Sequence, residues 1–312
     1  MKLGKLGVWY FTDTKSSADA AVFAKQVEAL GYSALWIPET VGRNPFVHAG
    51  WLLANTESLI LATGIASIYH RDPGASMAAA KTLAEQSGDR FILGLGVSHQ
   101  PMVEGVRGHN YGKPVSTMRA YLEQMAQAPY TAVASENPPP IVLAALGPKM
   151  LELSGTLADG AHPYFTTPDH TRTARGILGE DALLCVEQKV ILETDADKAR
   201  QLGRAASQTY AQLPNYRNNW KRLGFTDEEI DSSDRFIDEV FAWGDIGQIA
   251  ERVQAHLDAG ATHVCVQPIN PNGVFGEPDM VLLEQLVGEV GEGSPVLRRD
   301  GLRCWKIGRA HV

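Results

Sequence analysis

Cysteine is scarce in this chain. Only three occur among 312 residues, Cys185, Cys265 and Cys304, and they are odd in number and widely spaced. Disulfide-stapled domains need paired cysteines, and cysteine-based zinc sites need close CxxC-type pairs. We therefore expect reduced, mostly structural cysteines, with no disulfide framework and no cysteine metal site.

Long apolar runs and an excess of positive charge are also missing. No apolar stretch approaches the roughly 20 residues that span a bilayer, and the first ten residues lack the apolar core of a secretory signal. The formal net charge is −8, and lysines and arginines do not cluster as they do in proteins that neutralise nucleic-acid phosphates. We expect a cytoplasmic protein that binds neither membrane nor nucleic acid.

Several enzyme signatures are absent as well. The chain has no HExxH or HxH pair, no GxSxG elbow, no complete GxGxxG pattern and no Walker A loop. His48, His70 and His162 are candidates to line a site, but none forms a close ligand pair. A metal-dependent hydrolase and a serine hydrolase are therefore disfavoured, and no metal is predicted.

What the sequence does contain is a regular alternation of short apolar runs and amphipathic segments. This pattern is typical of parallel strands joined by crossover helices, and eight such units are the number in a closed α/β barrel, the (β/α)8 or TIM barrel. No linker-like change in composition divides the units, so one domain is expected at 1–290. Strands are expected at 6–9, 34–37, 59–65, 91–95, 141–146, 160–164, 183–192 and 264–268.

Helices are expected between these strands, and two other segments stand out. The segment after the fourth strand is longer than an ordinary connecting loop and suggests a functional insertion. The stretch 291–312 follows no preceding pattern and is interpreted as a non-native-looking or disordered tail. Helices are expected at 17–30, from Pro45, after Pro73, at 116–126, 149–157, 169–178, 195–220, near Phe236 and at 246–259.

Polar residues that follow the strands are the first candidates for chemistry, since barrel enzymes place their sites on these loops. Asp13 follows the first strand, Glu39 and Thr40 the second, and His99 the fourth. A carboxylate and an imidazole at one mouth can orient a ring or move a proton. Taken singly, Asp13 also fits a solvated acid, Thr40 a helix cap and His99 a surface histidine.

Glycines after two strands offer a second signal. Gly94 and Gly96 allow a phosphate or ring to approach the backbone, and the pair Gly147 and Pro148 ends a strand where a helix begins, with backbone N–H groups free for an anion. Such glycines are equally found in tight turns.

Together these motifs resemble the luciferase-like family of barrels, specifically its coenzyme F-420-dependent oxidoreductases, from about residue 3 to residue 287. Each motif is modest alone, and the specificity lies in their order and spacing. The motifs are Lys-Leu-Gly at 5–7, Leu-Trp-Ile-Pro-Glu at 35–39, Thr-Gly-Ile at 63–65, Arg-Asp-Pro at 71–73, the run 90–97, Ala-Ala-Leu-Gly-Pro at 144–148, Ala-Asp-Gly at 158–160 and the run 260–264.

The resemblance implies a cofactor in the mouth of the barrel. Its ring would lie against a bulge in the third strand that carries a non-proline cis peptide, by position between Gly64 and Ile65. The cofactor-binding residues implied in this way are Gly64, Ile65, Gly96, Val97, Ser98, Ala145, Leu146, Gly147 and Pro148. The stretch 213–219 resembles a subgroup of the same family, and this resemblance implies that it borders the substrate pocket.

The chain also departs from the family pattern. Glu39 matches an acidic residue that contacts the cofactor in relatives, but Thr40 stands where several relatives have a histidine. His99 stands where some have a glutamate, and Asp13 where some have another acid. Our hypothesis is a rearranged proton-handling set, with His99 as proton donor or acceptor, Glu39 and Thr40 positioning the ring or substrate, and Asp13 assisting.

The function implied is hydride transfer between coenzyme F-420 and a small organic substrate. Because family members are commonly dimers, the resemblance also implies a homodimer. Three alternatives remain open at this stage: an FMN-dependent monooxygenase, a flavin- or deazaflavin-binding protein without turnover, and a non-redox lyase or hydrolase. A lyase would need a Schiff-base lysine such as Lys149, which also fits the exposed first turn of a helix.

Overall fold

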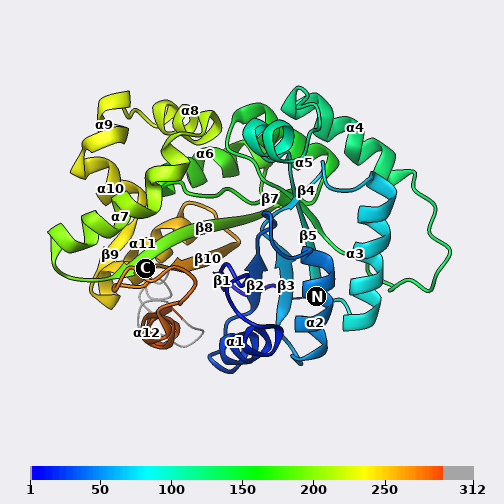
Figure 1. Ribbon diagram of the computed structural model, residues 1–312, viewed down its shortest axis with the longest axis horizontal. Helices are drawn as coiled ribbons and strands as arrows, with labels where there is room; N and C mark the ends of the chain where they lie inside the picture. Colours follow the sequence, from blue (N-terminus) through cyan, green and yellow to red (C-terminus); the bar gives the residue numbers. More distant parts are fainter. Residues whose placement is uncertain (1, 291–312) are drawn as a thin grey trace, which may run out of the picture.

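Eight parallel strands form a closed barrel in the computed structural model, which describes residues 2–290 (Figure 1). Neighbours in the barrel are neighbours in sequence, and the last strand pairs with both the first and the seventh, which closes the sheet. The predicted (β/α)8 barrel is confirmed, and each predicted strand is present, although those expected at 141–146 and 160–164 are three residues shorter. The barrel strands are β1 (Leu6–Trp9), β2 (Ala34–Ile37), β3 (Ile60–Thr63), β5 (Phe91–Gly96), β6 (Ile141–Leu143), β7 (Gly160–Ala161), β8 (Leu183–Leu192) and β10 (His263–Pro268).

The third strand differs from the expectation of one continuous strand at 59–65. It is interrupted after β3, and a two-residue strand, β4 (Ala66–Ser67), resumes the pairing with β5. Between β3 and β4 lies a cis peptide bond from Gly64 to Ile65, at the position that the family resemblance implied.

The helices that cover the barrel begin where the sequence marks their starts. Proline occupies the first turn of five of them, where its missing N–H costs nothing. The side-chain oxygens of Ser16, Asn44 and Asp72 each cap one of the first three. The last helix, α12, was not predicted. The covering helices are α1 (Ser17–Ala29), α2 (Pro45–Ala54), α3 (Pro73–Ser87), α4 (Pro114–Ala126), α5 (Pro148–Leu157), α6 (Pro168–Leu178), α11 (Ile246–Asp258) and α12 (Met280–Val290).

Two insertions interrupt this regular pattern. The one predicted after the fourth barrel strand contains a short π-helical segment, η1 (Pro101–Val106). A larger one follows β8, and Figure 1 shows its helices grouped together at one side of the barrel. The single helical stretch expected at 195–220 is broken, because Pro214 begins a new helix. The larger insertion comprises α7 (Ala196–Ala211), α8 (Pro214–Arg222), α9 (Asp227–Ser232), α10 (Asp234–Val240) and the strand β9 (Ala242–Gly244), which pairs with the end of β8.

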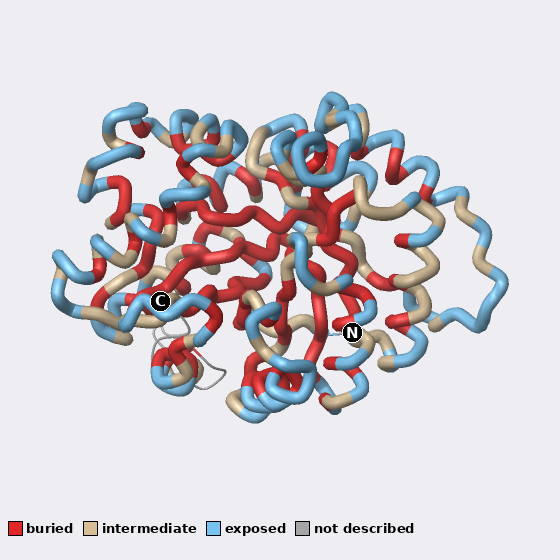
Figure 2. Tube along the Cα trace, viewed as in Figure 1, coloured by how far each residue is buried: buried red, intermediate tan, exposed pale blue. Residues whose placement is uncertain are grey.

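Buried residues follow the strands, and exposed ones follow the outer faces of the helices (Figure 2). Trp9, Trp36 and the free cysteines Cys185 and Cys265 lie in the barrel interior, in a hydrophobic cluster that continues into the α7–α10 insertion. Burial raises the pKa of the Cys185 thiol to about 12, so it stays protonated and structural, as predicted. Cys304 and the predicted tail at 291–312 lie outside the described residues. Within residues 2–290, no helix is long and apolar enough to cross a membrane.

Candidate functional site

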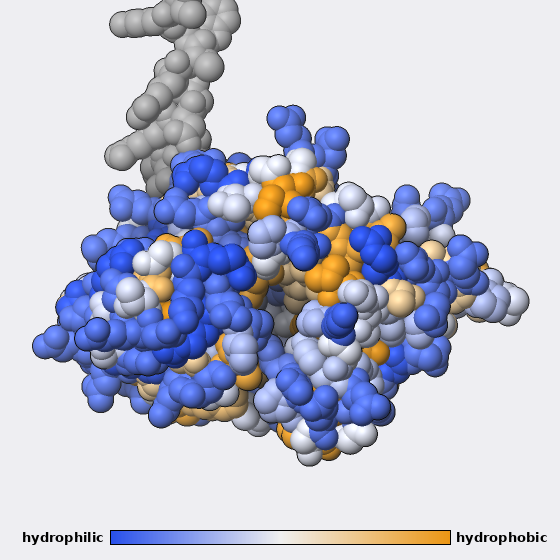
Figure 3. All heavy atoms as spheres, turned by 90° about the horizontal axis from the view of Figure 1, so that it is seen from above, coloured by the Kyte–Doolittle hydropathy of each residue, from blue (hydrophilic) through white to orange (hydrophobic). Residues whose placement is uncertain are grey.

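A cavity of about 540 Å³ opens at the carboxyl ends of the barrel strands. Figure 3 views the molecule from this side and shows a hollow between two raised parts, with apolar residues along it. A cavity of this size suits a ligand as large as a cofactor ring and part of its tail. Its walls are Ile65, Gly96, Val97, Ser98, His99, Tyr111, Pro114, Val115, Ala144, Ala145, Leu146, Gly147, Pro148, Lys149, Met150, His162, Tyr164, Asn215, Tyr216, Asn218 and Arg222.

The residues expected to bind a cofactor are brought together here. All of them line the cavity except Gly64, which lies directly behind it. The Gly64 carbonyl accepts a hydrogen bond from Trp9 Nε1 at 2.8 Å, and a Cβ on Gly64 would stand 2.6 Å from that nitrogen. Glycine is therefore required at this position by the indole behind the cavity wall, and Ile65 is presented to the cavity.

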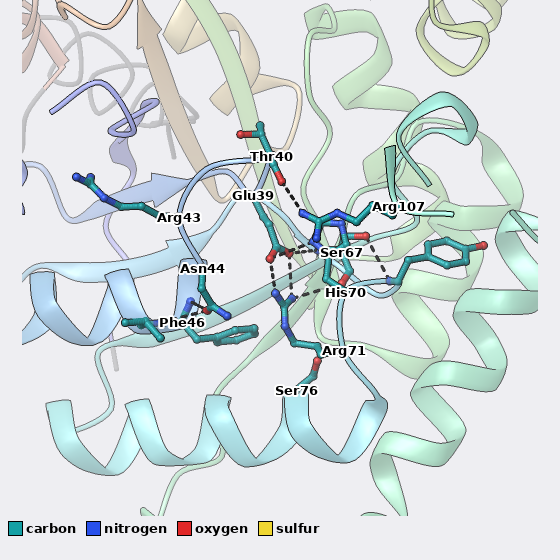
Figure 4. Close-up of polar contacts among 12 residues, drawn as sticks. Glu39, Thr40, Arg43, Asn44, Phe46, Ser67, His70, Arg71, Ser76 and Arg107 are labelled. Carbon is teal, nitrogen blue, oxygen red and sulfur yellow. Dashed lines mark hydrogen bonds and ion pairs between the residues drawn. The ribbon is translucent and has the colours of Figure 1, made fainter. Parts of the chain in front are cut away.

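Glu39 lies beside the cavity and not in its lining. Its carboxylate accepts hydrogen bonds from Arg71 Nη1 at 2.9 Å, from Arg71 Nη2 and from the backbone N–H of Ser67 at 2.8 Å, and His70 Nδ1 lies 3.1 Å from it (Figure 4). Burial raises the pKa of Glu39, but the bonds from Arg71 and Ser67 outweigh it, and on balance the pKa is lowered. The carboxylate is thus ionised and already paired.

These contacts change the role open to Glu39. Its backbone N–H donates to the Ile65 carbonyl at 3.2 Å, and its side chain holds Ser67 of β4. The expected direct contact of the Glu39 side chain with a ring or substrate is not supported by this arrangement. Glu39 instead fixes the bulge that carries Ile65.

Asp13 and Thr40 also lie apart from the cavity lining. Thr40 Oγ1 donates to Asp13 Oδ2 at 3.4 Å, and the Arg43 backbone N–H donates to Asp13 Oδ1 at 3.1 Å. Arg107, just after η1, donates to the Thr40 carbonyl at 3.1 Å (Figure 4). Asp13 and Thr40 therefore organise the loop after β2 and tie it to the η1 segment, and the expected contact of these side chains with a ligand is not supported.

His99 is the candidate proton-handling residue that does line the cavity. It follows β5, and its ring lies 5.7 Å from that of Tyr216 on α8. Burial lowers its pKa, and a hydrogen bond with the Asn215 side chain opposes the shift without cancelling it. The imidazole is therefore neutral near pH 7, and one ring nitrogen is available to hold or release a proton.

The sequence predicted only some of the residues that line the cavity. Asn215, Tyr216 and Asn218 line the cavity, as expected for the stretch 213–219, and so does His162. The lining residues that were not singled out include Tyr111 after η1, Tyr164 after β7, and Arg222 at the end of α8. The sequence offers a signal for two of them, since Tyr111 lies in the insertion predicted after the fourth strand and Tyr164 ends the strand predicted at 160–164.

One end of the cavity is positively charged. No side chain caps the N-terminus of α5, which begins at Pro148, and the exposed Lys149 follows in its first turn. The Arg222 guanidinium lies over the same turn, since a Cβ on Gly147 would stand 3.5 Å from Arg222 Nη2. Among residues 2–290, neither cation forms an ion pair with a carboxylate. This end is suited to an anion such as a phosphate.

Known proteins similar to this chain share its barrel. A protein from Mycobacterium tuberculosis, provisionally named a coenzyme F420-dependent oxidoreductase, is 26% identical over an alignment that covers 85% of this chain and 94% of that protein. The coenzyme F420-dependent tetrahydromethanopterin reductase from Methanopyrus kandleri superposes with a TM-score of 0.72 at 18% identity, covering 92% of this chain and 98% of that one. The FMN-bound oxygenating constituent of 3,6-diketocamphane monooxygenase from Pseudomonas putida gives 0.69 at 16% identity, covering 92% and 97%.

At these identities the two solved structures show a common fold and no more. The family profile described as luciferase-like monooxygenase matches residues 3–263, which is most of the chain and includes every barrel strand up to the start of the last. The chain therefore belongs to the luciferase-like monooxygenase family.

Proposed function

We propose that this protein is an oxidoreductase that transfers a hydride between coenzyme F-420 and a small organic substrate. The observation that carries the proposal is the cavity itself, with the Gly64–Ile65 peptide behind one wall and unpaired cations at one end. The similarity to the mycobacterial protein, which extends over nearly its whole length, supports the choice of coenzyme.

The residues present fit a flat ring with an anionic tail. Ile65, Val97, Ala145 and Leu146 supply apolar surface to a ring, and glycine at position 96 is required because a Cβ there would stand 2.4 Å from Ile65 Cδ1. Lys149, Arg222 and the N-terminus of α5 would hold a phosphate group. When bound, coenzyme F-420 supplies the ring carbon that accepts or gives the hydride.

The chain's own part is to orient the substrate and manage one proton. Hydride transfer from an alcohol carbon leaves a hydroxyl proton to be removed, and the reverse reaction requires one to be delivered. We assign this role to His99, which lines the cavity, is hydrogen-bonded to Asn215 and lies beside the buried Tyr216. The aromatic side chains of Tyr111, Tyr164 and Tyr216 in the walls restrict access of water to the reacting atoms.

FMN-dependent oxygenation is the main alternative. The apolar walls and the anion-binding end would accept FMN as well, and the FMN-bound Pseudomonas putida enzyme has the same fold. A protein that binds cofactor without turnover is a second alternative, and it would need no residue in the role of His99.

Parallel titrations of the purified protein with coenzyme F-420 and with FMN, followed by fluorescence, test the proposal. We expect low-micromolar binding of coenzyme F-420 and binding of FMN that is at least tenfold weaker, on the order of 1.4 kcal/mol. The opposite preference would support the monooxygenase. Binding of neither would overturn a cofactor-dependent function while leaving the barrel intact.

A further inference from the structure

His162 places a buried, unpaired hydrogen-bond acceptor in the wall of the cavity. It follows β7 directly, is 1% exposed and lines the cavity. Its Nδ1 lies 2.8 Å from the carbonyl oxygen of Cys185. A carbonyl oxygen only accepts, so Nδ1 carries the hydrogen and Nε2 has a free lone pair. No donor from the described residues reaches Nε2.

The ring cannot turn to find another partner. It stacks on the Trp36 indole, with 4.5 Å between ring centroids and an angle of 12° between the planes. Trp36 is itself fixed, because its Nε1 donates to His263 Nε2 at 3.0 Å. The stack and the Cys185 bond together determine where Nε2 lies.

Nε2 lies next to the peptide that precedes Ile65. A Cβ added to Gly64 would stand 3.3 Å from it. The donors nearby are already used: Trp9 Nε1 donates to the Gly64 carbonyl, and the Tyr164 hydroxyl is engaged with Tyr210 and Gln267 at 2.8 and 2.9 Å. The protein therefore leaves this acceptor to whatever occupies the cavity.

The charge state of His162 is constant over the useful pH range. Burial lowers its pKa to about 4; the Cys185 carbonyl opposes this shift, and the nearby His263 adds to it. The imidazole is thus neutral at physiological pH, and Nε2 acts as an acceptor and not as a donor. An unpaired buried acceptor is unfavourable, so a matching donor on a ligand gains affinity.

We infer that His162 is a ligand-binding residue whose Nε2 accepts a hydrogen bond from an N–H or O–H group of a molecule bound in the cavity. The identity of the donor rests on the proposed function. On that function, the donor is either a ring N–H or O–H of the cofactor or the hydroxyl of an alcohol substrate. A molecule that presents only acceptors at this point is selected against.

Nitrogen NMR of the full chain labelled with ¹⁵N-histidine tests this directly. Coenzyme F-420 is added first, FMN in a parallel sample, and propan-2-ol is added last to each. We expect the unprotonated Nε2 resonance of His162 to move upfield, while that of His263, already bonded to Trp36, stays in place. A shift with cofactor alone assigns the donor to the ring, and a shift only after propan-2-ol assigns it to the alcohol.

The same samples separate this inference from the proposed function. Fluorescence reports whether each cofactor is bound. If either cofactor is bound at saturation and the His162 resonance does not move before or after propan-2-ol, the role of His162 is refuted and the proposed site stands. If neither binds, both proposals fall.

Two substitutions give an independent readout. His162→Leu removes the acceptor, whereas His162→Gln keeps one in its side-chain oxygen. If the donor is on the cofactor, we expect the leucine variant to weaken cofactor binding roughly tenfold and the glutamine variant less than about threefold. His48→Gln is the control, since His48 is also buried but its ring is hydrogen-bonded to Thr12, outside the cavity lining. An equal loss in both His162 variants would contradict a specific acceptor.

Discussion

The carboxylate of Glu39 and the guanidinium of Arg71 form a buried two-point ion pair beside the cavity. The two side chains are 5% and 11% exposed. The Glu39 carboxylate also accepts a hydrogen bond from the Ser67 backbone N–H, and His70 Nδ1 lies 3.1 Å from it. Through Ser67 the pair joins the loop after β2 to β4, and so stabilises the bulge that presents Ile65. Glu39, for which the family resemblance implied contact with the cofactor, is thus paired with a residue 32 positions away in the sequence.

Removing this carboxylate is expected to destabilise the fold. Glu39→Gln leaves the buried Arg71 without its counter-charge, and breaking a buried pair costs about 3–5 kcal/mol. Urea unfolding followed by circular dichroism measures the loss. Arg172→Gln is the control, because Arg172 pairs with Asp169 on the surface, where the side chains are 67% and 84% exposed. A loss no larger than that of the control would contradict the structural role.

The same pair predicts a pH dependence. The pKa of Glu39 in the folded protein is below its usual value of 4.5, so the unfolded chain takes up the proton first as the pH falls. The contribution of the ionised carboxylate to stability is therefore complete above about pH 4.5 and is lost below it. The difference in unfolding free energy between the wild type and Glu39→Gln should be constant near neutral pH and shrink in acid. A difference in unfolding free energy that grows in acid would contradict this prediction.

His99→Ala is expected to abolish turnover while leaving cofactor binding nearly unchanged. Loss of a positioned proton donor or acceptor typically lowers the rate by about 10²–10⁴-fold. In the wild type, substrate reduction should accelerate as the pH falls toward the lowered pKa of His99, and substrate oxidation should slow. Rates measured across pH in both directions test this. Unchanged turnover in His99→Ala would exclude the role.

Arg222→Gln is expected to weaken binding of ligands that carry a phosphate. We predict a loss of roughly tenfold or more for FMN and little change for riboflavin, because a charge-assisted hydrogen bond contributes about 1.5–3 kcal/mol. Lys221→Gln is the matched control on the same helix, since Lys221 pairs with Asp227 and does not line the cavity. Equal losses for FMN and riboflavin would show that Arg222 acts through packing and not through its charge.

Much of the fold follows from local features of the sequence. Asn44 with Pro45, and Asp72 with Pro73, set the starts of α2 and α3, and the apolar runs between helices give all eight barrel strands. The break at Pro214 and the extra strand β9 were missed, the first because the helical pattern runs through 195–220. Strand β9 is three residues long, and it is stabilised by pairing with the end of β8.

The sequence predicts the parts of the site that depend on the local backbone. It does not predict contacts between residues that lie far apart in the sequence. Gly96 and Gly147 identify places of close backbone approach, and both line the cavity. The sequence does not reveal the partners of Glu39 and Asp13. The Arg71 guanidinium and the Arg43 backbone N–H approach these carboxylates only when the loops of the barrel are folded. Arg222 ends α8, within the insertion after β8, and its approach to Gly147 at the cavity depends on how that insertion packs.

A co-crystal structure with coenzyme F-420 tests whether this cavity is the cofactor site. We expect ring density against Ile65, within hydrogen-bonding reach of His99 or His162 for one polar group, and the phosphate of the tail between Lys149 and Arg222. Density for the coenzyme in another pocket, or an empty cavity at a saturating concentration, would contradict the assignment of this cavity as the cofactor site.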